Sequence, residues 1–202
     1  MDNTENNSRK NYGDEDFIYL MGNDGEVEQP KYETDITDGY IVMGEEKVVF
    51  MRKFQLDRKF SVIMPEKFKL MSKDVAEIKY PSADRPEFIY TNEETTVNFT
   101  FSHREDEASN EEIPEVKDIL QPLVMRLYPA SSVIKSETLE AGGKNISYYD
   151  FIAPALDMNI YTLTFVFSLE GRIVLGGFNC PEADMDDWKP IFLQMMESLE
   201  FA

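Results

Sequence analysis

Residues 159–178, NIYTLTFVFSLEGRIVLGGF, show the clearest strand pattern in the chain and decide the fold class. In the first half of this segment every second side chain is large and apolar, namely Tyr161, Leu163, Phe165, Phe167 and Leu169. A period of two is typical of a β-strand. Since the other face also carries Ile160 and Val166, we expect both faces to be covered and the strand to be central in its sheet. Glu170-Gly171-Arg172 then predicts a tight turn into an antiparallel strand at 173–178.

Similar alternation extends outward from this hairpin. Further strands are predicted at 48–54, 60–64, 88–91, 95–102, 133–139 and 146–153. In the segment 95–102, Val97, Phe99 and Phe101 form an apolar face, and we expect the opposite, polar face to contact solvent. Gly142 and Gly143 can adopt the positive φ angles of a second tight hairpin. The second half of the chain is therefore predicted to be a four-stranded antiparallel meander.

Two amphipathic helices are also predicted. The first spans 114–128, and we expect its apolar stripe to pack on the sheet; the stripe consists of Val116, Ile119, Leu120, Leu123, Val124 and Leu127. The second begins after the segment 180–183 and is expected to run to the C-terminus, with an apolar side made of Met185, Trp188, Phe192, Met195, Met196 and Leu199. Strands and helices in this order predict an α+β protein, in which helices flank a mainly antiparallel β-sheet as an α/β/α sandwich.

The composition excludes several classes of protein. The 202 residues are enough for one domain of ordinary size. With 20 Lys and Arg against 39 Asp and Glu, the net charge is −19, and we expect a chain so acidic to repel nucleic acid and anionic membranes. A single Cys excludes an internal disulfide, and a single His excludes a multi-His metal cluster. No segment approaches the roughly 20 apolar residues of a membrane span. The polar start lacks the apolar core of a secretory signal, so a cytoplasmic protein is expected.

Charge and apolar content divide the chain into two regions. Residues 1–46 contain 13 acidic and 3 basic side chains, and we expect an acidic, largely flexible N-terminal tail. Two short apolar segments, Phe17–Met21 and Tyr40–Met43, interrupt it, and each is long enough for one strand. They could dock on a partner, but an edge strand on the protein's own domain is the favoured interpretation because exposed apolar patches are costly. Residues 47–202 are predicted to form a single α+β domain.

Some segments resemble a known fold family. The stretch FSVIMPEKFKLM at 60–71, the first predicted helix, the meander and a last helix ending in SLEF resemble the PsbP-like fold. The stretch 79–101 is similar to a string seen in uncharacterised bacterial proteins of about this size. The resemblance covers 47–202 and implies an α+β sandwich. The fold is shared by a photosystem II extrinsic subunit, a nuclear-import factor and bacterial DcrB-like proteins, which are mostly binding proteins and adaptors. One subgroup resembles secretion chaperones that shield apolar segments. No site motif is transferred to this chain.

Two residues that often support catalysis occur once each. His103 lies among acidic and small polar residues, which suits a surface loop better than a general base. Cys180 lies between a strand and a helix N-terminus, where the helix dipole can stabilise a thiolate. Three acidic side chains oppose this effect, namely Asp184, Asp186 and Asp187. We interpret Cys180 as a small buried thiol at a strand end, and no catalytic residue is predicted.

The sequence also lacks the spacing of common ligand motifs. The run DMDD at 184–187 has neither the spacing nor the Gly of a calcium loop, so we interpret its carboxylates as first-turn residues of the last helix. Gly176 and Gly177 precede a helix but match neither dinucleotide-binding nor phosphate-loop spacing. They are expected to allow a close approach of a neighbouring side chain or backbone. No metal and no cofactor is predicted.

Two groups of residues are candidates for ligand or partner contact. The loop KYPSADRP at 79–86 is stiffened by two prolines and could present Tyr80 and Arg85 to a partner, with Phe88 following where the chain returns to the sheet. A well-tied connection, with Arg85 paired to a carboxylate, is the favoured interpretation. A sheet-helix cleft could be lined by Tyr148 and Tyr161, together with Tyr149 and Asp150. The 11 Met residues suit adaptable surfaces, but core filling is their commoner use.

These observations favour a non-enzymatic interaction module, an adaptor or chaperone-like protein that binds a polypeptide through a sheet face or a sheet edge. Self-association into a homodimer through an exposed strand is compatible with this hypothesis. The alternative is a small-ligand-binding protein, or an enzyme that uses a carboxylate in a sheet-helix cleft. A large apolar pocket around a carboxylate would favour that alternative.

Overall fold

The computed structural model describes residues 35–155 and 157–202, and this part of the chain contains three α-helices and eleven strands. The helices are α1 (Lys73–Lys79), α2 (Ile113–Met125) and α3 (Met185–Glu197), with short 3-10 turns η2 (Ile36–Asp38) and η3 (Glu182–Asp184). The strands are β1 (Tyr40–Met43), β2 (Glu46–Gln55), β3 (Phe60–Pro65), β4 (Lys69–Leu70), β5 (Phe88–Thr91), β6 (Asn98–Glu107), β7 (Val133–Ala141), β8 (Lys144–Pro154), β9 (Asn159–Leu169), β10 (Arg172–Pro181) and β11 (Glu200–Phe201).

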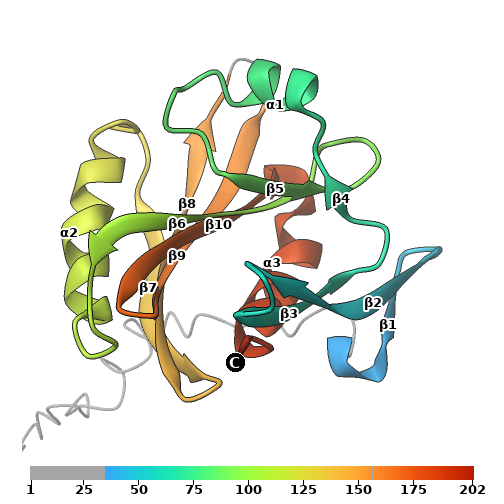
Figure 1. Ribbon diagram of the computed structural model, residues 1–202. Helices are drawn as coiled ribbons and strands as arrows, with labels where there is room; N and C mark the ends of the chain where they lie inside the picture. Colours follow the sequence, from blue (N-terminus) through green and yellow to red (C-terminus); the bar gives the residue numbers. More distant parts are fainter. Residues whose placement is uncertain (1–34, 156) are drawn as a thin grey trace, which may run out of the picture.

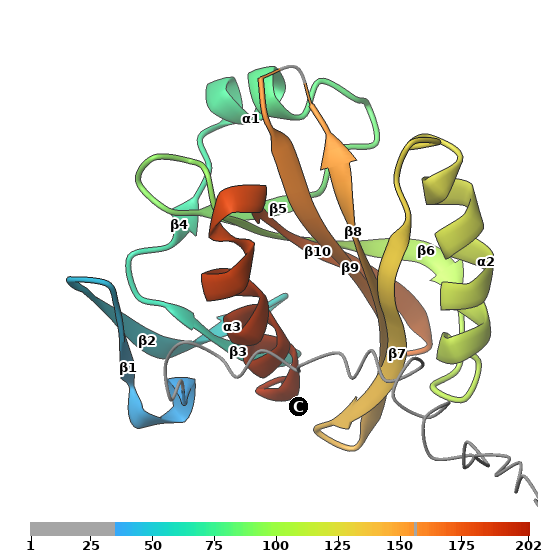
Figure 2. The ribbon, with the colours of Figure 1, turned by 180° about the vertical axis from the view of Figure 1, so that it is seen from behind.

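The strands form two antiparallel sheets. The larger sheet has seven strands in the order β4-β5-β6-β10-β9-β8-β7, and the smaller has four in the order β1-β2-β3-β11. Helix α2 covers one face of the larger sheet, and α3 lies with the smaller sheet on the opposite face (Figures 1 and 2). This three-layer arrangement confirms the predicted α+β class with helices flanking antiparallel sheet. The division of the strands into two sheets was not predicted.

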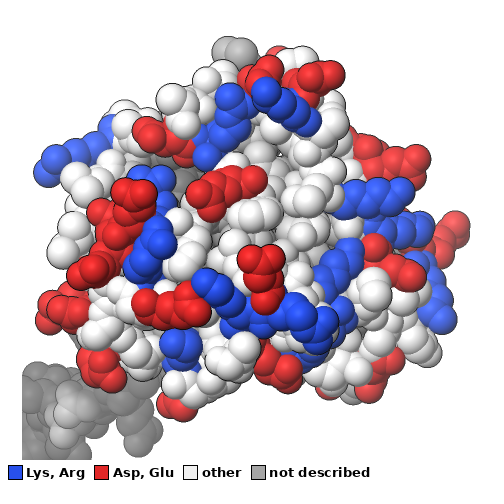
Figure 3. Space-filling view, viewed as in Figure 1, with Lys and Arg blue, Asp and Glu red and all other residues white. Residues whose placement is uncertain are grey.

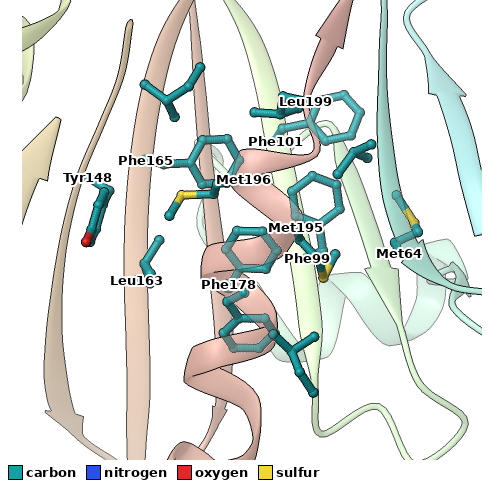
Figure 4. Packing of buried hydrophobic residues seen from close by; sticks show 14 of the residues in the cluster. Met64, Phe99, Phe101, Tyr148, Leu163, Phe165, Phe178, Met195, Met196 and Leu199 are labelled. Carbon is teal, nitrogen blue, oxygen red and sulfur yellow. The ribbon is translucent and has the colours of Figure 1, made fainter. Parts of the chain in front are cut away.

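The predicted meander and its central strand are confirmed. Strands β7, β8, β9 and β10 are consecutive neighbours, and β9 pairs with β8 on one side and β10 on the other. The alternating side chains of β9 point into the main core, where Phe165 and Phe178 meet Met195 and Met196 of α3 (Figure 4). Thioethers on the buried side of α3 fill the gaps between these rings.

The predicted close approach at a glycine is also confirmed. Gly176 on β10 lies opposite Phe165 on β9, and a Cβ atom added at Gly176 would overlap the Phe165 ring. The glycine therefore makes room for an aromatic side chain of the core, and this use explains the residue without a phosphate ligand.

The last helix ends earlier than expected. Helix α3 stops at Glu197, and residues 200–201 form β11 on the edge of β3. Phe201 then packs against Phe167, with ring centroids 5.2 Å apart. The expectation of a helix to the C-terminus was wrong. The last residues form a strand because they pair with β3 and pack on Phe167, and these tertiary contacts are not visible in the local sequence pattern.

Helix α2 packs with a narrower stripe than the sequence suggested. Ile113 is fully buried against the larger sheet. In contrast, Ile119, Leu123 and Leu127 are 64%, 50% and 74% exposed. Ile119 and Leu123 are four residues apart, so they share one side of α2, and Leu127 follows just after the helix ends at Met125. The expectation that the whole predicted stripe packs on the sheet was therefore wrong.

The polar face of β6 is covered, although we expected it to contact solvent. Asn98 and Thr100 are almost fully buried, and the side chain of Asn98 donates to Asn179 on β10 at 2.8 Å. Strand β6 also runs on to Glu107, so His103 lies within a strand and not in a surface loop. The Thr100 hydroxyl likewise donates to the carbonyl of Gly177 at 3.3 Å, and such bonds across the sheet lower the cost of burying polar side chains.

Residues 35–43 form the short turn η2 and the edge strand β1. Asp35 accepts hydrogen bonds from the backbone and the hydroxyl of Thr37, and Ile36 is 1% exposed. The second predicted apolar segment is therefore strand β1, paired with β2. The first, Phe17–Met21, lies outside the described residues, as does the remainder of 1–34.

Candidate interaction surface

The hairpin formed by β1 and β2 has one face in the core and one face in solvent. Tyr40 pairs with Val49 and Ile41 pairs with Val48, so the two strands alternate in step. Ile41 and Phe50 are 4% and 5% exposed and belong to the main core. These buried side chains anchor the hairpin, which extends to the right-hand margin of the molecule in Figure 1.

The opposite face of the hairpin carries four exposed apolar side chains. Their exposed fractions are 48% for Tyr40, 48% for Val42, 39% for Val49 and 45% for Met51. The ammonium group of Lys47 lies 3.9 Å from the centroid of the Tyr40 ring, which is a cation–π contact. Contiguous apolar side chains on a folded surface mark sites of interaction more often than isolated ones do. We call these five residues the hairpin face.

The hairpin face adjoins an open sheet edge. Strand β1 is at the end of the four-stranded sheet, and within the described residues it pairs only with β2. The amide of Phe50 donates to the carbonyl of Gly39 at 2.8 Å. This bond shows which residues of β1 direct their backbone groups toward β2, because every second residue of an antiparallel strand does so. By that alternation the backbone groups of Tyr40 and Val42 point away from β2. The same two residues thus offer side chains on the face and main-chain groups on the edge.

The surroundings of the hairpin are basic, although the protein is strongly acidic. Residues 47–79 contain nine of the 20 Lys and Arg, against four Asp and Glu. In Figure 3 basic side chains gather over the strands β2, β3 and β4. Lys53 is engaged in the structure, because its ammonium group donates to the carbonyls of Glu66 and Phe68 at 3.0 and 2.6 Å. Arg52 and Lys59 are also engaged, in ion pairs with Glu200 and Glu170. Lys69 and Arg58 are exposed and contribute positive charge to this part of the surface.

An open hollow of about 360 Å³ lies within this basic region. It is bounded by β4, the start of α1 and the β5–β6 loop, and its lining includes Lys67, Lys69, Leu70 and Asn92. The hollow mixes lysines with apolar and amide groups. It is wide open to solvent, so it suits a side chain or loop of a macromolecule better than an enclosed small ligand.

The predicted loop residues are partly engaged within the protein. The hydroxyl of Tyr80 accepts a hydrogen bond from the Asn179 amide at 3.3 Å, and burial raises the pKa of this hydroxyl. Phe88 stacks on Phe101 with ring centroids 4.7 Å apart. The backbone amide of Arg85 donates to Ser82. The loop is tied to β10 through Tyr80 and to β6 through Phe88, and Arg85 is half-buried.

Two of the predicted cleft residues, Tyr161 and Asp150, lie in a buried polar network beneath α3, whereas Tyr149 packs with Phe151 in a separate cluster next to α2. Tyr161 donates to Asp150 at 2.8 Å, and the ammonium group of Lys189 lies 2.7 Å from the same carboxylate oxygen. Asp150 is completely buried. Burial, with the nearby Asp150 carboxylate, raises the pKa of the Tyr161 hydroxyl. Tyr148 instead donates to Glu137 at 3.0 Å. The structure therefore joins Tyr161 to Asp150 and gives Tyr148 a different partner.

Cys180 and His103 are too far apart to act together. Along β10, Val174 faces His103 and Cys180 lies six residues further on, which corresponds to about 20 Å. Burial, with a smaller contribution from Asp184, raises the pKa of the Cys180 thiol to about 12. The interpretation of Cys180 as a buried thiol at a strand end is confirmed, because the side chain is 0% exposed.

Residues 35–155 and 157–202 contain neither a candidate metal site nor a membrane-spanning helix. No group of three or more His, Cys, Asp or Glu side chains is arranged to hold a metal ion in this part of the chain. No helix within these described residues is long and apolar enough to cross a membrane.

Sequence reasoning missed two features of this surface. The concentration of basic residues in 47–79 is visible in the sequence, but it disappears in a net charge taken over the whole chain. The exposure of the hairpin face is not visible, because Tyr40 and Ile41 are both apolar and only the sheet order shows which of them is covered.

Comparison with known proteins supports the fold. No family model and no curated protein sequence matches the chain. Among solved structures, the solution structure of cyanobacterial PsbP (CyanoP) from Synechocystis sp. PCC 6803 is similar over 80% of this chain and 98% of its own, with 13% identity and a TM-score of 0.56. LpqN of Mycobacterium tuberculosis, described as involved in cell envelope biogenesis, shows 8% identity and a TM-score of 0.49 over 77% of this chain and 91% of its own. The Ran-binding protein Mog1p of Saccharomyces cerevisiae shows 12% identity and a TM-score of 0.45 over 76% and 96%.

The likeness to CyanoP spans nearly the whole of that protein, 98% of its chain. At 13% identity it concerns architecture and not activity. The resemblance inferred from the stretch 60–71, the first predicted helix, the meander and the last helix is thereby confirmed: this chain has the PsbP-like fold.

Proposed function

We propose that the protein is a non-enzymatic interaction module that binds a polypeptide at the β1–β2 hairpin. The observation that carries this proposal is the juxtaposition of the hairpin face with the open edge of β1, both of which use Tyr40 and Val42. An extended peptide that pairs with the edge would satisfy the free backbone groups, and its alternate side chains would cover the apolar face.

The geometry favours strand addition over the binding of a helix in a groove. The hairpin face lies on two adjacent paired strands, and its side chains, such as Val42 and Val49, stand on the surface of the sheet. This surface is therefore a flat platform. A flat apolar platform next to an open edge is extended naturally by another strand. Lys47 and the basic stretch that follows it would favour a partner with acidic residues beside an apolar alternating segment.

The rival function, chemistry or ligand binding at a carboxylate, has weaker support. Asp150 is the buried acid that such a site would use, and Lys189 and Tyr161 both occupy one of its oxygens. The hollow of about 360 Å³ is lined by other residues, on β4, α1 and the β5–β6 loop. The polar network is explained by its structural role as a buried ion pair between the sheet and α3.

The proposal also includes the location and the class of partner. A net charge of −19 supports a protein partner over nucleic acid. We place the interaction in the cytoplasm, and we keep pairing of two copies through β1 as one form that strand addition could take.

A comparison of two surface variants tests the proposed function. The variant Tyr40→Ser/Val42→Lys changes the hairpin face, and Ile119→Ser/Leu123→Ser changes the exposed side of α2 by similar steps. Proteins cross-linked to each variant and to the unaltered chain in cell extract would be identified by mass spectrometry, and binding of each purified candidate would then be measured by calorimetry. We expect a partner that binds the unaltered chain and the α2 variant equally, and the hairpin variant at least tenfold more weakly. Equal binding to all three proteins would refute the assignment of the hairpin.

A further inference from the structure

Helix α2 carries a second exposed surface, at the margin of the molecule opposite the hairpin (Figures 1 and 2). We propose that this surface binds an amphipathic helix of another protein, in which Lys or Arg accompanies the apolar side chains. Three exposed residues of α2 follow one another at intervals of four and share one side of the helix, and one exposed residue beyond each end extends the row: Glu111, Glu115, Ile119, Leu123 and Leu127. We call these five residues the α2 surface. The inference goes beyond the proposed function, because it assigns a different partner to residues that the hairpin does not contain.

The opposite side of α2 fixes the helix to the larger sheet. Ile113 is fully buried and clusters with Val166 of β9. Lys117 is only 9% exposed, and its ammonium group donates to the hydroxyl of Ser136 on β7 at 2.9 Å. That hydroxyl in turn donates to the side chain of Gln121 at 2.8 Å. These contacts hold the helix from its buried side, so the apolar residues of the α2 surface are not needed to attach it.

The C-terminal half of the α2 surface is apolar. Ile119 and Leu123 are large apolar side chains in solvent, and Leu127 lies just beyond them. Side chains spaced by four residues form a ridge along a helix, and such a ridge packs into the groove of a second helix. A partner helix that lies along α2 would therefore cover these side chains together.

The N-terminal half of the α2 surface and its surroundings are acidic. Residues 104–118 contain seven Asp and Glu against two Lys and Arg. Ala108 clusters with Ile113, which brings the acidic end of β6 to the start of α2. In Figure 3 acidic side chains gather at the left, over this part of the molecule. Because Lys117 already pairs with Asp118 at 3.0 Å, the remaining charge favours a partner that carries Lys or Arg.

Pro122 frees a hydrogen-bond acceptor beside the same residues. A proline has no backbone N–H, so the carbonyl of Asp118 lacks the donor that residue 122 would supply in an uninterrupted helix. Asp118 and Pro122 are both exposed, and each directly precedes a member of the α2 surface. A Lys or Arg of the partner can donate to this carbonyl, which adds a directional contact to the attraction between charges.

A model helix tests the position and the type of ligand. The probe is a synthetic peptide of Leu and Lys whose Leu residues form one side of a helix. The controls are a Leu/Glu helix and a peptide of the same Leu/Lys composition in strict alternation, which suits a strand. We expect calorimetry at about 0.15 M salt to show binding of the Leu/Lys helix and at least fivefold weaker binding of each control. The amide NMR signals of residues 115–123 should shift on binding, and those of Tyr40–Met43 should not. Equal binding of the alternating peptide, or shifts at Tyr40–Met43 instead, would overturn the proposal.

Removal of the apolar side chains gives the main comparison between variants. Ile119→Ser/Leu123→Ser should bind the Leu/Lys helix at least tenfold more weakly than the unaltered chain. The matched control Val42→Ser/Val49→Ser, on the hairpin face, should bind it as the unaltered chain does. All four side chains are exposed, and a circular dichroism spectrum verifies that each variant is folded. Equal effects of the two variants would refute the assignment to α2.

Removal of charge gives an independent comparison. Glu111→Gln/Glu115→Gln should weaken binding of the Leu/Lys helix about threefold or more at about 0.15 M salt. Glu93→Gln/Glu94→Gln removes the same charge from exposed residues of the β5–β6 loop and should have a smaller effect. If both variants weakened binding equally, the net charge of the chain would attract the peptide, and the role of the α2 surface would be disproved.

A second copy of this chain is the other candidate occupant, since its hairpin carries basic and apolar side chains. In that case sedimentation would show concentration-dependent complexes of the unaltered chain, and Ile119→Ser/Leu123→Ser and Val42→Ser/Val49→Ser would each abolish them. This result would replace the partner helix by a second copy and overturn the proposal, whereas a monomer that binds the Leu/Lys helix supports it. None of these measurements uses a partner of the hairpin, so this inference and the proposed function can fail separately.

Discussion

The buried ion pair between Lys189 and Asp150 allows a quantitative test of the structure. The two groups are 2.7 Å apart, Asp150 is 0% exposed, and the Lys189 side chain is 23% exposed. Replacing Lys189 by Met removes the charge and keeps most of the aliphatic stem. Loss of one partner of a buried pair costs about 3–5 kcal/mol, since the remaining charge is left uncompensated. We expect the lower end, about 3 kcal/mol, because Tyr161 still donates to Asp150 and Lys189 retains some contact with water.

Urea and thermal unfolding provide the assay. Trp188 is the only Trp in the sequence, and its ring centroid lies 5.7 Å from that of Phe192, so its fluorescence reports on α3. For a domain of this size each 1 kcal/mol lowers Tm by roughly 2–4 °C, so Lys189→Met should lower Tm by about 6–12 °C. The double variant Asp150→Asn/Lys189→Met should recover most of the loss, because a neutral amide still accepts from Tyr161 and no charge stays buried.

An exposed pair provides the matched control. Lys135 and Glu137 are 2.9 Å apart, but their side chains are 44% and 51% exposed. Lys135→Met should therefore change the free energy of unfolding by no more than about 1 kcal/mol. If Lys189→Met and Lys135→Met lowered stability by the same amount, burial would not be the cause of the effect and the reasoning would be refuted.

Three further predictions follow from burial and packing. Gly176→Ala forces a methyl group into the Phe165 ring and should cost about 1–3 kcal/mol in urea unfolding, and Phe165→Leu in the same chain should recover part of this loss. The pKa of the Cys180 thiol is raised from its ordinary value of 9.0 to about 12, so above pH 9 the unfolded chain releases a proton that the folded chain keeps. Stability should fall as pH rises from 9 to 12, and the Cys180→Ala variant should show a shallower decline; identical slopes would contradict this cause. Ile119→Ser on the exposed side of α2 should change stability by less than about 0.5 kcal/mol, whereas Ile113→Ala should cost about 2–5 kcal/mol because Ile113 is fully buried. Comparable losses for the last two variants would contradict the observed orientation of the helix.

Strands were predictable because their signal is local. Strand β5 occupies Phe88–Thr91, the predicted range, and β9 occupies Asn159–Leu169 as predicted. In both cases the alternation of side chains and the turn residues that follow are contained within a dozen positions. The order of the last four strands could also be predicted, because short turns join neighbours in an antiparallel sheet.

The coverage of each face was not predictable, because it depends on segments distant in sequence. The polar side of β6 looked solvated, yet Asn98 bonds to Asn179, which is 81 residues away. The apolar stripe of α2 looked wide enough to be buried, yet only the side that includes Ile113 meets the sheet. The periodic spacing of apolar residues shows that the two faces of a strand or helix differ, but it does not show which segment of the chain, if any, packs on each face.

For the candidate surface, too, the local sequence predicts the strand, whereas its place in the sheet depends on residues distant in sequence. The segment Tyr40–Met43 could be recognised as a strand from its four apolar residues alone. Its position at the end of the smaller sheet depends on whether another strand lies on its outer side, which is a tertiary property that the local pattern does not contain; within the described residues it pairs only with β2. Asp150 could likewise be identified as an acid among aromatics, but its partner Lys189 lies on a helix that follows two further strands.

Apolar surface and charge would make different contributions to binding at the hairpin. At physiological ionic strength charges are screened over about 8 Å, so only acidic groups close to the basic stretch contribute to the bound state. The four apolar side chains of the hairpin face are insensitive to salt and would determine most of the affinity. The basic stretch would mainly accelerate the encounter with an acidic partner. A partner therefore has to match the apolar pattern of the hairpin face, because acidic charge alone does not cover it.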